Sequence, residues 1–310
     1  MRSRLIGFGA GAAVTLLMLL TGKEEQLVIG VITGLAYSLV ALGLVLVYKS
    51  SGVFNFAQAE FGTVALFVVY LCRVNGMSYV LAALVGLAAA VVMGLLVERA
   101  VVRPLFEAPR VTLLVATAGV ALLSIGTTFW LNDTQGHTIG AAITGDAFTI
   151  FGIRISWQRM LIVLVVAVIG VLLAVFFNRT TLGLAVLAAS QEPTATELVG
   201  VSVRRLSTLV WALAALLGGL AGILIGPFEP FFPGAITSKV LIPGFTAAVI
   251  GGMSSLPGAV VGGIIVGVGQ SLGASGSLLP QSVPGGGAVV TFALLALILA
   301  IRPQGLLGKA

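Results

Sequence analysis

The chain has 310 residues, of which 59% are hydrophobic and 8% are charged, whereas an ordinary soluble domain has about 25% charged residues. One cysteine and one histidine exclude an intrachain disulfide and a cysteine–histidine metal cluster. The formal net charge of +6 comes from basic residues scattered over separate loops, which favours contact with anionic lipid headgroups over nucleic-acid binding.

Apolar runs follow one another along almost the whole sequence. A helix needs about 20 mostly apolar residues to cross a hydrocarbon core of about 30 Å, and these runs lack the alternation of a transmembrane β-barrel. The sequence therefore predicts an all-α, polytopic membrane protein with a single transmembrane domain over residues 1–310. We expect about ten membrane segments, at residues 5–20, 27–48, 54–72, 78–97, 111–131, 158–177, 206–226, 241–253, 257–273 and 285–301.

The first of these segments lies in residues 1–24 and is expected to be an extra N-terminal helix. Its Arg-flanked start would also suit a cleavable signal peptide, but the following stretch TLLMLLTGKEE lacks a small-x-small cleavage site. Retention of the helix is therefore favoured, and cleavage would leave the later topology unchanged.

Lys and Arg predict how the segments are oriented, because cytoplasmic loops are enriched in them. With both termini inside, the inner side holds Arg2, Arg4, Lys49, Arg99, Arg103, Arg110, Arg179, Arg204, Arg205, Arg302 and Lys309, and the outer side holds Lys23, Arg73, Arg154, Arg159 and Lys239. We therefore expect both termini in the cytoplasm.

The stretch YKSSGVFNFAQAEFGTV, residues 48–64, places polar side chains between two apolar runs. We expect residues 49–52 to form a cytoplasmic elbow from which a helix continues at about 100° per residue, with Asn55 and Gln58 on one face and Glu60 on another. One hypothesis is that Asn55 and Gln58 border a translocation path or its inner gate, while Glu60 pairs with a neighbouring helix. The alternative is that all three only cap the elbow and make packing bonds.

The fifth segment carries Thr117, Ser124 and Thr128 on one helical face. These hydroxyls could contact a passing polar solute. Hydroxyls in membrane helices more often bond to the backbone of their own helix or tie helices together, so the structural interpretation is favoured.

The outer loop from Leu131 to Trp157 contains Asp133, His137, Asp146 and Arg154. These residue types suit docking of a soluble partner, although an ordinary solvated loop is the default. Catalysis or metal binding by the lone histidine is disfavoured, because no motif spacing accompanies it.

The inner loop, residues 178–205, is expected to contain a short cytoplasmic helix. Pro193 suits the first turn of a helix and Gly200 suits a C-terminal cap, which predicts a helix over residues 193–199. The sequence has no GxxxxGK[ST] phosphate loop, so a separate motor protein would have to supply force through this helix. A plain amphipathic connector would look similar.

The eighth segment, LIPGFTAAVIGGM, is too short to cross the membrane unaided. Because Pro and Gly interrupt it, it is tolerated at membrane depth only inside protein or beside a wet cavity. Pro243, Gly244 and Phe245 are therefore candidates for a translocation path; a short peripheral helix is the alternative.

Glycines recur at helical spacing late in the chain, as in Gly218, Gly222 and Gly226. Small residues let helices approach closely in lipid. We expect this spacing to serve internal packing rather than contact with a partner subunit.

Five segments together resemble the LivH-type permeases of branched-chain amino acid ABC importers, and more distantly ribose-type permeases. They are GLAYSLVALGLVLVYKSSGVFNFAQAEFG, LLVATAGVALLSIG, AVLAASQEPTATELVGVSVRR, PGFTAAVIGGMSSLPGAVVGGIIVG and RPQGLLG. NFAQAEFG followed by GGMSSLPGAVVGG is a specific pair, and the resemblance covers most of the chain from Gly34 onward.

The resemblance implies a fold of the type II ABC importer class, in a bacterial inner membrane, that moves solute by alternating access. It implies two ABC ATPase subunits that use ATP and Mg²⁺, a second LivM-like permease or an identical copy, and an extracytoplasmic solute-binding protein; no cofactor is expected on this chain. The loop in residues 178–205 resembles the ATPase-docking segment of these permeases, though it departs from the better-known EAA pattern. Its candidate coupling residues are Ala189, Gln191, Glu192, Pro193, Glu197 and Gly200. The candidate path or gate residues are Asn55, Gln58, Glu60, Thr117, Ser124, Thr128, Pro243, Gly244 and Phe245.

The substrates that the resemblance implies are leucine, isoleucine and valine, while relatives that carry urea, short amides or other small carboxylates leave alternatives open. An ion-coupled secondary transporter is disfavoured because the spans hold few carboxylates. A membrane-embedded enzyme is disfavoured because no nucleophile, base or metal constellation is evident.

Overall fold

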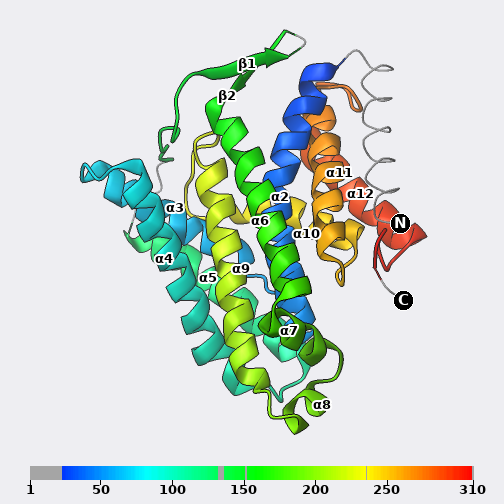
Figure 1. Cartoon of the computed structure of the whole chain (residues 1–310). Coiled ribbons are helices and arrows are strands. Elements are labelled where there is room, and N and C mark those ends of the chain that lie inside the picture. The colour runs from blue at the N-terminus through cyan, green and yellow to red at the C-terminus, as the bar shows by residue number, and fades with distance from the viewer. Residues whose placement is uncertain (1–22, 132–135, 151, 235, 309–310) are drawn as a thin grey trace.

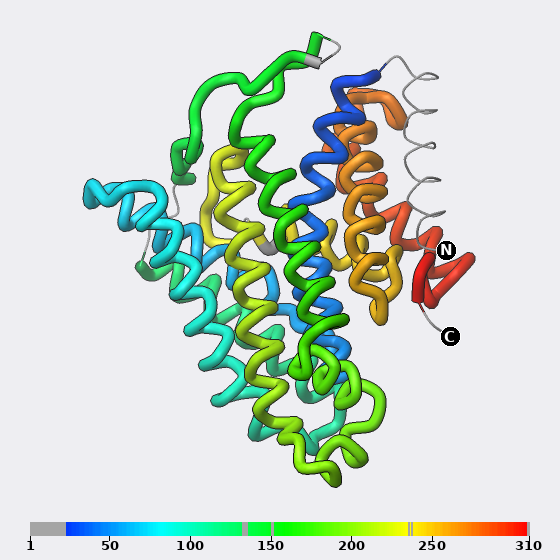
Figure 2. The backbone as a smooth tube through the Cα atoms, viewed as in Figure 1, coloured from blue at the N-terminus to red at the C-terminus, as the bar shows by residue number. Residues whose placement is uncertain are grey.

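The structure, a computed structural model, describes residues 23–131, 136–150, 152–234 and 236–308. In this part of the chain a helical bundle carries one β-hairpin at one end (Figures 1 and 2). The α-helices are α2 (Glu24–Ser51), α3 (Gln58–Val74), α4 (Tyr79–Val97), α5 (Arg110–Leu131), α6 (Trp157–Arg179), α7 (Thr181–Gln191), α8 (Pro193–Leu198), α9 (Val203–Ile225), α10 (Ile242–Gly251), α11 (Leu256–Ala274) and α12 (Gly286–Ile301). The remaining elements are the π-helix η1 (Glu98–Val102), the 3₁₀-helix η2 (Arg103–Leu105), the π-helix η3 (Thr237–Leu241) and the strands β1 (Asp146–Ile150) and β2 (Ile153–Ser156).

Every membrane segment expected from residue 27 onward coincides with a helix, so these helices are confirmed. Six helices in the described ranges are long and apolar enough to cross a membrane: α2, α4 with η1 and η2, α5, α6, α9 and α11. The expected segments at α3, α10 and α12 are helices of 17, 10 and 16 residues, shorter than an untilted crossing requires. The segment predicted at residues 5–20 lies outside the described residues.

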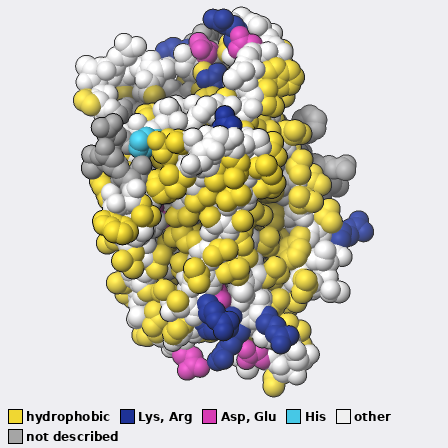
Figure 3. All heavy atoms as spheres, turned by 90° about the vertical axis from the view of Figure 1, so that its left-hand side faces the viewer, with side chains coloured by type: hydrophobic (Ala, Val, Ile, Leu, Met, Phe, Trp, Pro, Cys, Tyr) yellow, Lys and Arg dark blue, Asp and Glu magenta, His cyan; other side chains and the backbone are white. Residues whose placement is uncertain are grey.

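Helix α2 lies at the centre of the bundle, beside α9, α10 and α11 (Figure 1). Its sequence is apolar on all sides, as expected of a buried helix, and 72% of its most apolar window is buried, against 22% for α6. Helix α6 therefore lies at the periphery. On the face shown in Figure 3, apolar side chains cover the middle, and most of the charged side chains lie toward the two ends. Such a distribution is typical of a membrane-spanning protein.

Glycines let the central helices touch. A Cβ added at Gly34 of α2 would collide with the backbone of Gly263 on α11, and one at Gly222 of α9 would collide with the backbone of Gly62 on α3. The predicted use of spaced glycines for internal packing is therefore confirmed at these contacts.

Two breaks interrupt the helical backbone inside the bundle. Helix α2 ends at Ser51, and Gly52, which caps it, has a left-handed φ of 67°. Residues 52–57 form an elbow before α3 begins at Gln58. The expectation of an elbow at residues 49–52 is therefore wrong, because residues 49–51 still belong to α2 and the left-handed glycine ends that helix. The helix expected to continue from residue 52 starts only at Gln58, so Asn55 lies outside it. The second break precedes α10, where η3 leads into Pro243 in the first turn.

Helix α10 is buried almost throughout and packs against α2, α11 and α12. The chain after α12 also covers its end, since the backbone amide of Leu306 donates to the carbonyl of Ile250 at 2.7 Å. The interpretation of α10 as a short peripheral helix is therefore wrong, and its Gly and Pro residues lie inside protein.

The loop between α5 and α6, which was expected on the outer side, contains an antiparallel hairpin, β1–β2, that was not expected from the sequence. Arg154 lies 4.0 Å from Asp146 across it. His137 forms an isolated bridge with Phe231, with backbone hydrogen bonds of 2.9 and 2.8 Å, and its ring stacks on Tyr70 at 4.5 Å between centroids. These contacts give His137 a packing role, and Asp133 lies outside the described residues.

Candidate functional site

The elbow brings together the polar residues that stood out in the sequence. Asn55 Oδ1 accepts a hydrogen bond from the backbone amide of Ala57 at 3.0 Å, and Asn55 Nδ2 donates to Gln58 Oε1 at 3.4 Å. Both amide side chains are fully buried. Asn55 therefore closes an Asx turn in the elbow, immediately before α3, whose first turn has no side-chain cap.

Gln58 also ties three helices together. Its Nε2 donates to the carbonyl of Ala214 on α9 at 2.8 Å, and its amide packs against Gly43 of α2 and Gly218 of α9. This geometry favours the packing alternative for Gln58 over contact with solute.

Glu60 is fully buried two residues after Gln58 on α3. Its carboxyl group lies near the hydroxyl groups of Ser124 on α5 and of Thr63. Glu60 therefore faces a neighbouring helix, and its pairing with that helix stays a prediction.

The hydroxyl stripe of α5 forms the buried face of that helix. Thr117 Oγ1 accepts from the backbone amide of Phe56 at 3.3 Å and donates to the carbonyl of Leu114 at 3.0 Å. Thr128 Oγ1 donates to the carbonyl of Ile125 at 2.8 Å. These bonds support the structural interpretation of the stripe and attach α5 to the elbow.

An apolar cavity of about 210 Å³ lies where the elbow meets α10. Its lining consists of aliphatic and aromatic side chains with one amide: Leu44, Phe54, Asn55, Phe56, Leu241, Ile242, Phe245, Phe292 and Leu295. Two predicted path residues, Asn55 and Phe245, thus border one cavity. Pro243 and Gly244 are buried beside it, and Gly244 packs on Val40 of α2.

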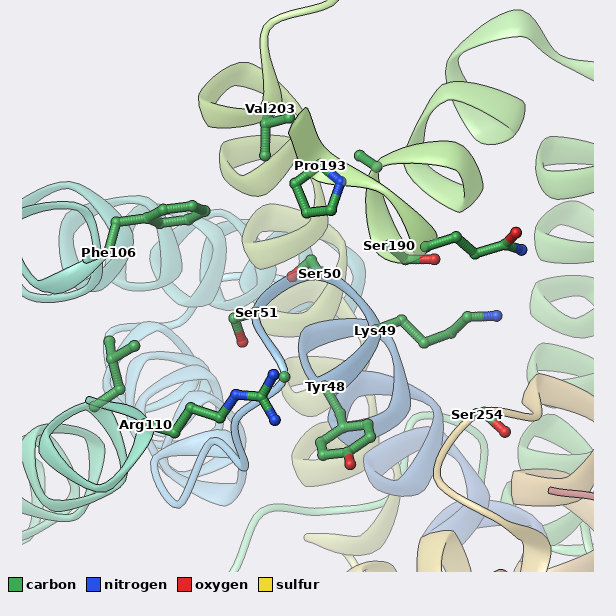
Figure 4. A pocket seen from close by; sticks show the side chains of 14 residues that line it. Tyr48, Lys49, Ser50, Ser51, Phe106, Arg110, Ser190, Pro193, Val203 and Ser254 are labelled. Atoms are coloured by element: carbon green, nitrogen blue, oxygen red, sulfur yellow. The ribbon is translucent and has the colours of Figure 1, made fainter. Parts of the chain in front are cut away.

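A second, larger cavity of about 680 Å³ lies at the end of the bundle that carries α7 and α8 (Figure 4). We call it the basic vestibule, because Lys49 and Arg110 are its charged lining residues. The others are Tyr48, Ser50, Ser51, Gly52, Phe106, Leu113, Ala189, Ser190, Gln191, Pro193, Val203 and Ser254. The start of the elbow and the predicted coupling loop therefore face the same cavity.

The loop of residues 178–205, for which ATPase coupling is predicted, contains the expected short helix, α8, which starts at Pro193 and is followed by Gly200 with a φ of 83°. Leu198 and Val199 are 84% and 78% exposed, which is unusual for apolar residues outside the membrane helices. Glu192 and Glu197 are also exposed. The position of this helix is confirmed, and its exposed apolar tip suits insertion into another protein.

An ion pair at the same end was missed from the sequence. Glu98 is 1% exposed, and its Oε2 lies 3.2 Å from Nη2 of Arg103, which also donates to Thr208 Oγ1 on α9 at 2.9 Å. Glu98 begins the π-helix η1 and Arg103 follows its last residue, and the usual helical periodicities do not anticipate the wider turn between them. Within the described ranges no group of three or more His, Cys, Asp or Glu residues is placed to hold a metal ion.

Comparison with known proteins agrees with this architecture. Residues 26–300 match the family described as branched-chain amino acid transport system / permease component. The chain belongs to this family. Over 300 residues it is 30% identical to the high-affinity branched-chain amino acid transport system permease protein BraD of Pseudomonas aeruginosa, covering 92% of this chain and 95% of BraD.

Two further relatives have the same general role. The permease protein LivH of Escherichia coli is 28% identical over 299 residues, with 92% of this chain and 95% of LivH covered. The ribose import permease protein RbsC of Escherichia coli is 28% identical over 241 residues, with 74% and 72% covered. No solved structure matches significantly. The resemblance inferred from the five sequence segments is therefore confirmed, and the chain is a multi-pass permease of this family.

Proposed function

We propose that this protein is the permease subunit of an ATP-driven importer for leucine, isoleucine and valine. The observation that carries the proposal is the match to branched-chain amino acid permeases over residues 26–300. The apolar cavity at the elbow is consistent with it, because a path for aliphatic amino acids needs few charged groups.

The proposed complex contains two ABC ATPases, which bind and hydrolyse ATP with Mg²⁺, and a second permease that is either LivM-like or an identical copy. A solute-binding protein delivers ligand on the outer side, and this chain binds no cofactor. The exposed apolar tip of α8, formed by Leu198 and Val199, supports docking of an ATPase at this end.

The proposed mechanism is alternating access in a type II-like importer, with both termini in the cytoplasm. Basic residues support this orientation: Lys49 and Arg110 line the vestibule beside the coupling loop, and cytoplasmic ends are enriched in Lys and Arg. ATP-driven closure of the ATPases would move α7 and α8, which share the vestibule with the elbow. The elbow and α10 would then open and close the path between the permeases.

Uptake of labelled leucine into proteoliposomes tests the proposal. The vesicles hold this chain with its second permease and ATPases, the binding protein is outside, and ATP is inside. Uptake that requires both ATP and the binding protein is expected. Omission of the binding protein and a non-hydrolysable ATP analogue are the controls.

Other outcomes would change the proposal in defined ways. ATP hydrolysis stimulated by a binding protein loaded with urea, a short amide or another small carboxylate, without leucine uptake, would keep the importer and replace its substrate. Uptake driven by an ion gradient without ATPases would overturn the importer itself.

A further inference from the structure

Three aromatic rings form a continuous contact between the two cavities. The ring of Phe54 stacks on Tyr48, with centroids 5.2 Å apart and an interplanar angle of 29°. The Phe54 ring also meets the ring of Phe245 edge-on, with centroids 5.3 Å apart. Tyr48 lines the basic vestibule, whereas Phe54 and Phe245 line the apolar cavity. Phe54 therefore lies where one cavity ends and the other begins.

The three rings come from the parts of the bundle where the helical backbone is interrupted. Tyr48 is in the last turn of α2, Phe54 is in the elbow, and Phe245 is in the short helix α10. Interrupted backbone at membrane depth is tolerated where it packs inside protein or lines a cavity. Phe54 therefore joins the elbow to the first turn of α10, next to both interruptions of the helical hydrogen-bond pattern.

The elbow begins at Gly52, directly after α2. Its φ of 67° is a conformation that other residues rarely adopt, and a Cβ added there would lie 3.4 Å from Cζ of Arg110. Pro193 and Gln191 of the coupling loop line the same vestibule as Gly52. The loop and the elbow therefore line one cavity, so a displacement of the loop can change the position of the elbow.

We propose that Phe54, whose ring contacts both Tyr48 and Phe245, is the gate between the apolar cavity and the basic vestibule. The proposal rests on the proposed function, which makes the vestibule the cytoplasmic mouth of the path. Stacked rings close the passage because an apolar constriction excludes water and polar solutes. Rotation of the elbow about Gly52 would draw Phe54 out of the stack and open the cavity to the vestibule.

Thiol labelling behind the gate tests the proposal without any substrate. Cys72 is replaced by Ser, which leaves the chain without cysteine, and Leu295→Cys puts a reporter in the cavity wall on α12. In inside-out vesicles a membrane-impermeant thiol reagent is expected to label this reporter slowly. Adding Phe54→Ala should raise the labelling rate severalfold. Adding Phe292→Ala, which removes a ring of the cavity wall outside the stack, should raise the rate much less, because the contacts of Phe54 with Tyr48 and Phe245 stay intact.

Equal labelling rates in the Phe54→Ala and Phe292→Ala proteins would overturn the proposal. Phe54→Leu keeps most of the buried apolar volume and gives a second test, with an intermediate rate expected. Binding-protein-stimulated ATP hydrolysis identifies variants that still fold and assemble, and the comparison is made among those.

A transport measurement separates the gate from the proposed substrate. Proteoliposomes loaded with leucine should release it faster without ATP when Phe54 is Ala than when Phe292 is Ala. If the parent complex imports no leucine but the labelling difference holds, the gate stands and the substrate assignment fails. If leucine is imported and labelling is unchanged in Phe54→Ala, the gate fails and the importer stands.

Discussion

Asn55 and Gln58 lie three residues apart, and their amide groups share a hydrogen bond of 3.4 Å. Asn55 also borders the apolar cavity, whereas Gln58 also donates to the carbonyl of Ala214 inside the helix packing. Sequence periodicity placed both residues on one face of a single helix. In the structure Gln58 begins α3, while Asn55 belongs to the elbow that precedes it.

These separate contacts predict different effects of alanine substitution at the two positions. Gln58→Ala should lower the unfolding free energy by about 1–3 kcal/mol, because it removes a buried hydrogen bond and leaves the buried carbonyl of Ala214 without the donor that Gln58 provides. It should leave leucine uptake per assembled complex nearly unchanged. Asn55→Ala should reduce uptake per assembled complex, because Asn55 is the amide in the lining of the apolar cavity. Thermal unfolding in detergent and proteoliposome uptake measure the two quantities.

Gln281→Ala, at an exposed amide before α12, is the control and should change neither quantity. Loss of uptake in Gln58→Ala with normal stability would show instead that Gln58 contacts solute.

Gly222 gives a second prediction at the scale of single residues. A Cβ at this position would collide with the backbone of Gly62, so Gly222→Ala should destabilise the protein by about 1–3 kcal/mol through overpacking. Gly170→Ala on α6 meets open space and should leave stability unchanged or raise it, because alanine is the better helix former. Equal melting temperatures for the two variants would contradict the close contact of α3 and α9.

At the scale of elements, α8 combines a precise start and stop with an exposed apolar tip. Pro193 begins it and the left-handed Gly200 follows its end, so its position could be predicted from residue type alone. What the tip contacts could not be predicted in the same way, because exposure depends on how α7 and α9 hold the loop.

Replacing both Leu198 and Val199 by Glu should weaken ATPase docking, because the two apolar side chains would no longer be buried in the partner. We expect loss of co-purifying ATPase and of binding-protein-stimulated ATP hydrolysis, with the melting temperature of the permease unchanged. Ile143→Glu, at an exposed apolar residue on the hairpin side, is the matched control. Retention of normal ATPase binding by the double variant would exclude α8 as the docking element.

At the scale of the whole molecule, the loop that carries α7 and α8 and the hairpin β1–β2 lie at opposite ends of the bundle (Figure 1). Single cysteines at Thr194 in α8 and at Thr144 before β1, in the Cys72→Ser protein, test the orientation. In cells, an impermeant thiol reagent should label Thr144→Cys from outside and should label Thr194→Cys only after permeabilisation. Labelling of both positions from outside would contradict the cytoplasmic assignment of the coupling loop.

Composition and hydrophobic runs were sufficient to predict a polytopic helical membrane protein and the positions of α2, α3, α4, α5, α6, α9, α10, α11 and α12, because the need to bury about 20 apolar residues per crossing is local information. The glycine spacing likewise indicated where helices touch. Only the tertiary structure decided that α10 is buried, that Asn55 but not Gln58 borders the apolar cavity, and that Phe54 contacts both Tyr48 and Phe245. The longest of these ring contacts joins residues 191 positions apart (245 − 54). Such contacts depend on which faces of distant helices pack together, which no local pattern encodes.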